Sequence, residues 1–204
     1  MKHQCTGNGS RRVAAFLGIL GILGVVSGLY GADSKKDEVS ADAIVRELQA
    51  KKPGSHEKKL LTGTDGGGNM IVFTDHQQIV RVTVTVWLSN RSVVTDLFFS
   101  DGSLTMSEYL TKFAVFDSSE QTLHPAGKGE QAAEVRETML FRGQKLLRWT
   151  LQSTLPREKI PDPIGDWKNT LADAEFFYAT AQRAETTIDI EDFLKNGAPA
   201  RQQH

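Results

Sequence analysis

Thiol chemistry is almost absent from this chain, because its 204 residues include one cysteine, Cys5. That cysteine precedes an apolar run near the N-terminus, which is not where a lipoprotein cysteine would lie. The rest of the sequence can therefore form neither a disulfide framework nor a thiolate metal site, and it has no cysteine nucleophile. A chain without thiols beyond its first residues fits an oxidising compartment.

Positive charge is also scarce, since 24 Lys and Arg residues stand against 25 Asp and Glu residues. Removal of residues 1–32 would take away Lys2, Arg11 and Arg12 and leave 21 basic against 25 acidic residues. Nucleic-acid binding requires clustered basic side chains that neutralise phosphates. The charge balance therefore excludes nucleic acid as the expected partner.

Metal-binding and nucleophile motifs are missing as well. The histidines beyond residue 32 form neither H-x-H nor H-E-x-x-H, and no G-x-S-x-G elbow is present. The long polar segment Asp117–Ala133 carries His124 and Lys128 as its candidate chemical groups. Carboxylates such as Asp96 and Glu108 could pair in space for hydrolysis of a sugar link. The sequence predicts no catalytic residue, cofactor or metal ion, and leaves open a periplasmic, hydrolase-like enzyme that uses these His or carboxylate groups.

The first 32 residues have the composition of a targeting segment. Arg11 and Arg12 precede the uncharged run Val13–Val26, which is the order of the basic and apolar regions in a secretory signal peptide. Small residues permit cleavage after Gly28 or Ser34, whereas cleavage after Ala32 would place Tyr30 at the third position back, where a small residue is preferred. The segment therefore predicts export to the periplasm or out of the cell.

An inner-membrane anchor is the alternative for the same segment. The uncharged stretch Val13–Ala32 is 20 residues long, enough to span a bilayer as a helix. Gly24 and Gly28 would then form a G-x-x-x-G packing face, as in a membrane-anchored assembly subunit. Contact with a membrane is expected only through residues 13–32, if they are retained.

Residues 33–68 are expected to form a spacer, a short helix and a glycine-rich linker. Ser40 suits the N-cap of that helix, and Ile44 and Leu48 give it a narrow apolar stripe. Thr62–Asn69 (TGTDGGGN) lacks the Gly-Lys-Ser/Thr entry into a helix that a phosphate-binding loop needs, and a strand follows it. We interpret this stretch as a turn or linker.

The segment Gln78–Leu88 (QIVRVTVTVWL) is the central strand of the predicted sheet. Val80, Val82, Val84, Val86 and Leu88 alternate with Arg81, Thr83, Thr85 and Trp87, which is the period of two typical of a half-buried strand. We expect the valine-rich side to face a core and the other side to face solvent or a ligand.

Strands are expected at six places, and short polar turns such as Asp101-Gly102 and Gly143-Gln144 join several of them. Such turns form antiparallel hairpins, whereas parallel pairing needs a crossover of a dozen or more residues. The expected strands are Met70–Thr74, Ile79–Leu88, Val93–Ser100, Ser103–Phe116, Val135–Arg142 and Lys145–Gln152.

Two helices are predicted after the strands. Trp167, Leu171, Ala174, Tyr178 and Ala181 lie on one helical face, which we expect to pack on the sheet. A last short helix is expected to begin at Thr186–Asp189, to carry Ile190, Phe193 and Leu194, and to end at Gly197.

The fold class expected from these patterns is α+β. It consists of a single antiparallel meander sheet of five or six strands, a short N-terminal helix and two C-terminal helices, the first packed on one sheet face. The domain is expected to span residues 69–196, and residues 197–204 are expected to be a disordered tail.

Three segments share the order aromatic residue, polar turn, aliphatic residue: Phe73–Ile79, Phe99–Leu104 and Phe141–Leu146. The hairpin Val135–Trp149 (VRETMLFRGQKLLRW), together with Leu97–Leu104 (LFFSDGSL), resembles the aromatic-rich hairpins of uncharacterised exported bacterial domains built as antiparallel meanders. The likeness covers about a fifth of the chain. It implies a fold and a location, and no activity.

One set of residues is a candidate ligand surface. If the arginines of neighbouring strands share the face of Trp87, the sheet would offer a cationic, aromatic surface to a small anionic or peptide ligand. Pairing of the arginines with Asp96, Glu108 and Glu137 across strands is the alternative. The candidate residues are Arg81, Thr83, Thr85, Trp87, Arg136 and Arg148. The function that the sequence favours is a non-catalytic binding or accessory protein of the bacterial cell envelope, with an envelope protein or such a ligand as partner.

Overall fold

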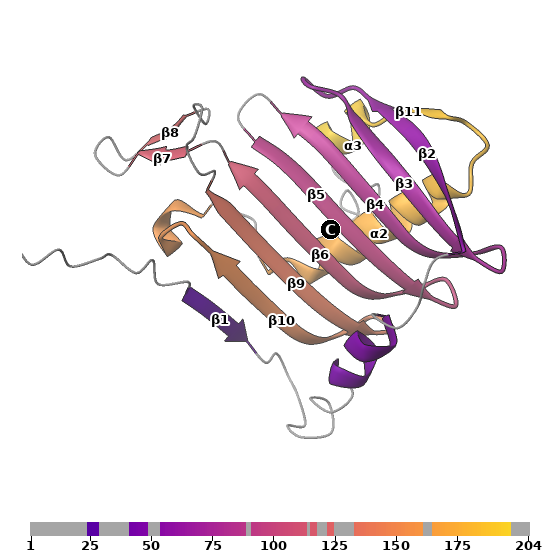
Figure 1. The fold of residues 1–204 in the computed structure, drawn as a ribbon, viewed down its shortest axis with the longest axis horizontal. Helices are drawn as coiled ribbons and strands as arrows, with labels where there is room; N and C mark the ends of the chain where they lie inside the picture. The colour runs from indigo at the N-terminus through magenta and orange to yellow at the C-terminus, as the bar shows by residue number, and fades with distance from the viewer. Residues whose placement is uncertain are drawn as a thin grey trace, which may run out of the picture.

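One large sheet dominates the computed structural model, which describes residues 24–28, 41–48, 54–88, 91–113, 115–117, 122–124, 133–160 and 165–196. Its nine strands lie in the order β1-β10-β9-β6-β5-β4-β3-β2-β11 (Figure 1), and β7 and β8 form a separate pair. The strands are β1 (Gly24–Gly28), β2 (Ser55–Thr62), β3 (Gly68–Asp75), β4 (Gln78–Leu88), β5 (Arg91–Ser100), β6 (Ser103–Phe113), β7 (Val115–Asp117), β8 (Thr122–His124), β9 (Glu134–Arg142), β10 (Lys145–Ser153) and β11 (Thr187–Asp189).

The expected five- or six-stranded antiparallel meander is wrong. All six expected strands are present and antiparallel, but the sheet is larger and mixed, because β11 runs parallel to β2. The sequence of β2, SHEKKLLT, gave no strand signal, because it does not alternate and only Lys59 and Leu61 are buried. Strand β11 has three residues, too few for any periodicity to be visible.

Strand β1 lies within the segment expected to be a signal peptide or anchor. It pairs antiparallel with β10, from Gly24 opposite Ser153 to Gly28 opposite Trp149. Gly24 and Gly28 are therefore in a strand and not in a helix. Removal of residues 1–32 would leave β10 as the edge of the sheet.

Three hairpins of the sheet have the same local structure. β3–β4, β5–β6 and β9–β10 each turn through two residues, His76-Gln77, Asp101-Gly102 and Gly143-Gln144. In each, the second strand carries one extra residue three positions after the turn, namely Val80, Thr105 or Leu147. Such β-bulges bend a strand and increase its twist, so all three hairpin ends are bent at the same distance from their turns.

The bulge at Val80 corrects the expected alternation of the central strand. Ile79 packs against the main core, as do Leu104 and Leu146 at the equivalent positions of the other two hairpins. Val80 is the extra residue, so it drops out of the valine-rich face that Val82, Val84 and Val86 form. The matching aliphatic residues had been recognised in the sequence. Of the aromatic residues in the same pattern, Phe99 and Phe141 are equivalent, since they are opposite Leu104 and Leu146, whereas Phe73 corresponds to Phe98 and not to Phe99.

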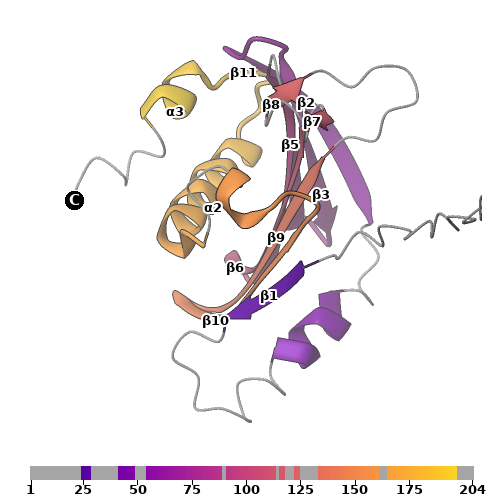
Figure 2. The same ribbon diagram turned by 90° about the vertical axis from the view of Figure 1, so that its left-hand side faces the viewer.

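Helix α2 (Trp167–Ala181) covers one face of the sheet (Figure 2), with the bounds that the sequence predicted. Its Ala174, Phe177 and Ala181 pack with Val82 and Val84 in the main core. Asp166 is the N-cap, because its Oδ1 accepts the Asn169 backbone N–H at 3.1 Å. Phe177, 4 % exposed, is the most buried aromatic residue of the helix, and its burial contributes about 2–3 kcal/mol.

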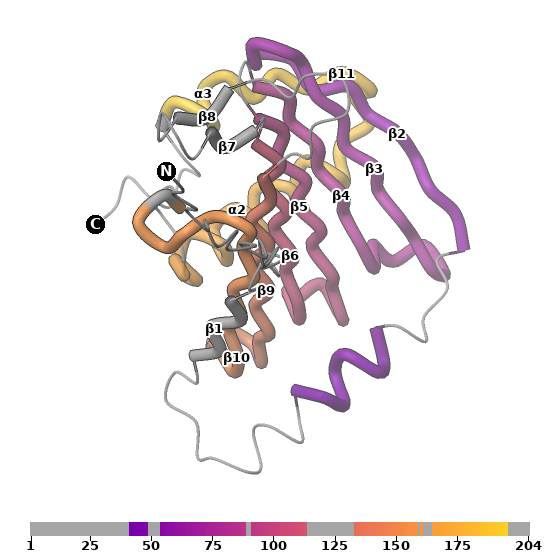
Figure 3. The backbone as a smooth tube through the Cα atoms, turned by 60° about the vertical axis from the view of Figure 1, so that its left-hand side comes forward, coloured from indigo at the N-terminus to yellow at the C-terminus, as the bar shows by residue number. Residues whose placement is uncertain are grey.

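The opposite face of the sheet, which we call the open face, is covered at one corner by the helix of residues 41–48 (Figures 2 and 3). Ala41 and Leu48 of this helix pack against Met106, Leu140 and Leu147, close to the hairpin ends. Ser40, its expected N-cap, lies outside the described residues.

The last helix begins later in the chain than the sequence predicted. Thr187–Asp189, expected to begin the last helix, form β11, and helix α3 (Glu191–Asn196) follows. The Oδ1 of Asp189 accepts the Glu191 backbone N–H at 2.9 Å, so it satisfies the first N–H of the helix. Phe193 of α3 stacks on Phe176 at 4.4 Å between ring centroids. The expected tail, residues 197–204, lies outside the described part of the chain.

Candidate functional site

All residues of the candidate ligand face lie on the open face, because the register aligns them. Arg136 of β9 is opposite Leu110 of β6, which is opposite Val94 of β5, which is opposite Thr85 of β4. Arg148 belongs to a second row, opposite Leu140. Arg81, Thr83 and Trp87 share the face of Thr85 by strand alternation.

Ion pairs neutralise most of the positive charge on this face. The Arg81 guanidinium donates to Asp96 Oδ1 from Nε at 2.9 Å and from Nη2 at 2.7 Å. It also lies over the rings of Phe73 and Phe98, at 5.2 and 5.1 Å from their centroids. Arg148 pairs with Asp42 of the helix of residues 41–48 at 2.8 Å. Of the expected pairings, that of Arg81 with Asp96 is present, and Glu137 lies on the other face.

Of the candidate catalytic groups, only the two carboxylates have side chains within the described part of the structure. Asp96 and Glu108 are opposite each other on β5 and β6, on the open face, and Asp96 Oδ1 already accepts from Arg81 and the Thr83 hydroxyl. His124 is in β8, where only the backbone is described, and Lys128 lies outside the described residues. Among the described residues, His, Cys, Asp and Glu form no group of three that could hold a metal ion.

In the described part of the chain, two clefts lie on the other face, between α2 and the bent hairpin ends. The larger, which we call the polar cleft, has a volume of about 450 Å³ between the β3–β4 turn, the start of β2 and the end of α2. Hydroxyl and amide side chains dominate its lining. The residues are Ser55, His56, Glu57, Val72, Thr74, Gln77, Gln78, Ile79, Tyr178, Ala181 and Gln182.

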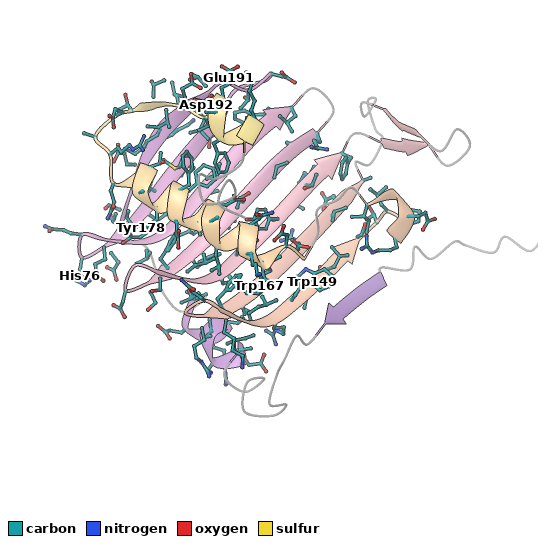
Figure 4. The ribbon with its side chains drawn as sticks, turned by 180° about the vertical axis from the view of Figure 1, so that it is seen from behind. His76, Trp149, Trp167, Tyr178, Glu191 and Asp192 are labelled. Carbon is teal, nitrogen blue, oxygen red and sulfur yellow. The ribbon has the colours of Figure 1, made fainter. Side chains whose placement is uncertain are left out.

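The smaller cleft, which we call the apolar cleft, has a volume of about 270 Å³ and lies beside the middle of α2. It is formed by the turns of the other two hairpins, through Gly102 and Gly143, and by Phe99, Leu104 and Leu171. Tyr178 lines both clefts, and its ring packs on Phe99 at 4.8 Å between centroids. Figure 4 shows Tyr178 on the part of α2 nearest the hairpins, and His76 at the tip of β3–β4.

The turn beside the polar cleft is strained. His76 and Gln77 have φ values of 47° and 67°, which are the type I′ positions normally taken by Asn-Gly or Asp-Gly. The β5–β6 turn meets the same requirement with Asp101-Gly102. Gln77 has no left-handed preference, and strained backbone positions of this kind cluster at active sites, ligand clamps and switch regions. Gln77 lines the polar cleft, so the strain lies at the cleft itself.

Neither cleft is lined by Lys or Arg. The polar cleft has one carboxylate, Glu57, which pairs with Lys59 at 3.2 Å, and the apolar cleft has Glu175. An anionic ligand would therefore find no lysine or arginine side chain in either lining. The clefts suit an uncharged molecule.

A match to the S-x-x-K spacing of nucleophile motifs, Ser55-His56-Glu57-Lys58, occurs at the polar cleft. These residues form strand β2, so Ser55 and Lys58 project from opposite faces of the sheet. The Ser55 hydroxyl bonds to that of Thr74 at 2.7 Å. The geometry therefore gives Ser55 a hydrogen-bonding role and no activating lysine.

One buried carboxylate lies on the α2 face outside both clefts. Glu137, 8 % exposed, accepts the Trp149 Nε1–H at 2.9 Å and the Gly165 backbone N–H at 2.7 Å through Oε2. Burial raises the pKa of this carboxyl above its usual value, and the two hydrogen bonds partly oppose that rise. Its contacts join β9, β10 and the start of α2, which is a structural role.

The comparisons with known proteins give no relative. No family model, no curated protein and no solved structure matches this chain. Within the described ranges, no helix is long and apolar enough to cross a membrane.

The sequence did not identify the cleft residues. Gln78 of β4 lies about 100 positions before Tyr178 and Gln182, which are at the end of α2. The available signal was the repeated hairpin pattern, because the three hairpin ends build both clefts. It indicated a repeated structure without showing that the ends meet α2.

Proposed function

We propose that this protein is a non-catalytic binding protein of the bacterial cell envelope. Its polar cleft would hold a small uncharged molecule rich in hydroxyl or amide groups, such as a short saccharide. The observation that supports this is the lining of the cleft, where Gln77, Gln78, Gln182, Ser55 and Thr74 surround a volume of about 450 Å³. That volume is typical of small-molecule sites.

The chemistry of the lining supports an uncharged ligand. Amides and hydroxyls both donate and accept hydrogen bonds, as the hydroxyl groups of a saccharide do. Val72, Ile79 and Ala181 provide an apolar floor, against which the C–H surface of a sugar ring can pack. Tyr178 separates the two clefts, so a longer ligand could extend past it into the apolar cleft.

Preorganisation supports the same site. The strained turn fixes Gln77 at the rim, and Lys59 fixes the end of the cleft by binding the carbonyls that follow α2. A rim that is rigid before binding loses less conformational entropy when a ligand arrives.

A nuclear magnetic resonance titration of the ¹⁵N-labelled full chain tests the proposal. The probe is chitotriose, a neutral trisaccharide that carries both hydroxyl and amide groups. We expect shifts at the amides of Gln78, Tyr178 and Gln182. Gln78→Ala combined with Gln182→Ala should weaken binding about thirtyfold, since each of the two lost hydrogen bonds contributes about 1 kcal/mol.

Gln152→Ala is the matched control, because Gln152 is an exposed glutamine of β10 outside both clefts. It should leave binding unchanged. A trisaccharide of galacturonic acid should bind more weakly than chitotriose, because neither cleft has a basic lining residue. The absence of any amide chemical-shift change up to about 10 mM chitotriose would refute the proposal. Cleavage of chitotriose, detected by mass spectrometry, would refute its non-catalytic part.

Placement in the envelope is proposed from the N-terminal sequence, Arg11-Arg12 followed by Val13–Val26. Mass spectrometry of the protein recovered from a periplasmic extract tests it. A mature N-terminus between residues 29 and 35 supports export with cleavage, and recovery only from the cytoplasm contradicts export.

A further inference from the structure

The open face of the sheet carries apolar side chains where a solvated face would carry polar ones. Trp87 is 43 % exposed at the end of β4. Val94 and Leu110 are opposite each other on β5 and β6, and both are only half-buried. These residues lie towards the end of the sheet away from the hairpin turns. The helix of residues 41–48, which packs near the turns on Met106 and Leu140, does not cover them.

Two charged side chains in this region have no ion-pair partner among the described residues. On strands β4, β5, β6 and β9 of the open face, Arg81 pairs with Asp96 and Lys112 pairs with Glu134. Glu108 and Arg136 remain. They are diagonal neighbours on β6 and β9, since Glu108 is opposite Thr138 and Arg136 is opposite Leu110. The region has therefore one free negative and one free positive charge, and no net charge.

We propose that two copies of this chain associate through this surface, which we call the dimer patch: Trp87, Val94, Glu108, Leu110 and Arg136. A two-fold axis brings the same surface of both copies together, so each contact between the two copies occurs twice. Arg136 of one copy faces Glu108 of its partner, and the reverse pair forms at the symmetric position. Val94, Leu110 and Trp87 provide the apolar centre between them.

Charge complementarity favours a second copy over another partner. An acidic or a basic partner would match one of the two free charges and repel the other, whereas an identical surface matches both. Sheets that pack face to face lie about 10 Å apart with their strands roughly aligned, which suits a flat face without a deep groove.

The available area is of the same order as a stable interface requires. Five neighbouring strands, β3, β4, β5, β6 and β9, span about 20 Å across the sheet, and eight residues of each extend about 27 Å along it. The flat area is on the order of 500 Å², and the accessible surface of protruding side chains is larger. A stable interface buries about 800 Å² on each partner. This inference does not depend on the proposed saccharide site, which lies on the other face.

Sedimentation velocity of the full chain, measured between about 1 and 100 μM, tests the proposal. The unmodified chain should form dimers in this range. Arg136→Glu and Glu108→Arg should each weaken dimerisation at least tenfold, because each places like charges opposite one another. The double variant Glu108→Arg with Arg136→Glu exchanges the two charges and should restore the dimer.

Two further variants make the result decisive. Glu175→Arg, an exposed charge reversal on α2, is the control and should dimerise as the unmodified chain does. Trp87→Glu tests the apolar centre at an exposed position where loss of folding is not expected, and it should give a monomer with an unchanged circular dichroism spectrum. A chain that stays monomeric at 100 μM refutes the proposal. A dimer that none of the patch variants weakens refutes it equally, because another surface must then be used.

Discussion

The ammonium group of Lys59 donates to the carbonyl oxygen of Arg183, 124 positions away, at 2.6 Å. A second bond from the same group reaches the carbonyl of Glu185 at 3.1 Å, and the side chain is 0 % exposed. The carbonyls follow the C-terminus of α2, where backbone acceptors lack helical partners. A buried lysine of β2 thus attaches the connection between α2 and β11 to the sheet.

Replacement of this lysine tests its structural role. Lys59→Met should lower the free energy of unfolding by about 1–3 kcal/mol, because two carbonyls lose a charged donor. Urea denaturation measures the change. Lys58→Met is the matched control, since Lys58 is the exposed neighbour on the same strand, and it should change stability by less than about 0.5 kcal/mol. Equal effects of the two variants would show that Lys59 does not hold this connection.

The guanidinium plane of Arg81 is predicted to matter as well as its charge. Arg81→Lys keeps the charge but loses the two-donor contact to Asp96 and the contact with Phe73 and Phe98. We expect a loss of about 1 kcal/mol in the free energy of unfolding. Thermal or urea denaturation measures it, and Arg136→Lys on the same face should be neutral. An unchanged stability in Arg81→Lys would show that the charge alone is sufficient.

Glu137 should make the stability depend on pH. Burial raises the folded pKa of this carboxyl above the ordinary value of 4.5, so the folded state binds the proton more tightly than the unfolded state. Stability therefore falls as the pH rises from about 4.5 through the folded pKa, and then levels off.

Comparison with Glu137→Gln isolates this contribution. The glutamine side chain of the variant cannot ionise. The free energy of unfolding of the variant, relative to that of the unmodified chain, should therefore increase as the pH rises through the same interval. Urea midpoints at several pH values measure the difference. A difference that is constant with pH would contradict a raised pKa for Glu137.

The strained β3–β4 turn offers a stabilising substitution. His76→Asn combined with Gln77→Gly places Asn-Gly at the two positive-φ positions and should raise the free energy of unfolding by about 1–2 kcal/mol. Asp101→Asn in the equivalent β5–β6 turn should be neutral, because Asp-Gly already suits that conformation. A destabilised double variant would mean that His76 or Gln77 makes contacts worth more than the strain.

Several parts of the fold follow from local pattern. Helix α2 was predicted to the residue, because its stripe from Trp167 to Ala181 is long and is bounded by a proline-rich segment and a polar one. The six central strands were predicted because alternation and turn residues act over a few neighbouring positions. The Arg81–Asp96 pair was predicted as an alternative for the same reason, since strands joined by a short connection place their polar faces side by side.

Other features were determined only by the tertiary structure. Strand β2 has four charged or imidazole side chains among its first five residues, and it is a strand because β3 and β11 supply its hydrogen bonds. Thr187–Asp189 resembles a helix start but pairs with β2. The helix preference of three residues is too weak to outweigh the hydrogen bonds offered by the edge of the sheet. The bulge at Val80 likewise moved Ile79 into the core. In each case the free energy comes from contacts between segments far apart in the chain, which local periodicity does not contain. The sequence by itself determined the central strands and the helix that covers them. Long-range packing decided the edges of the sheet, the burial of Lys59 and the meeting of three hairpin ends at Tyr178.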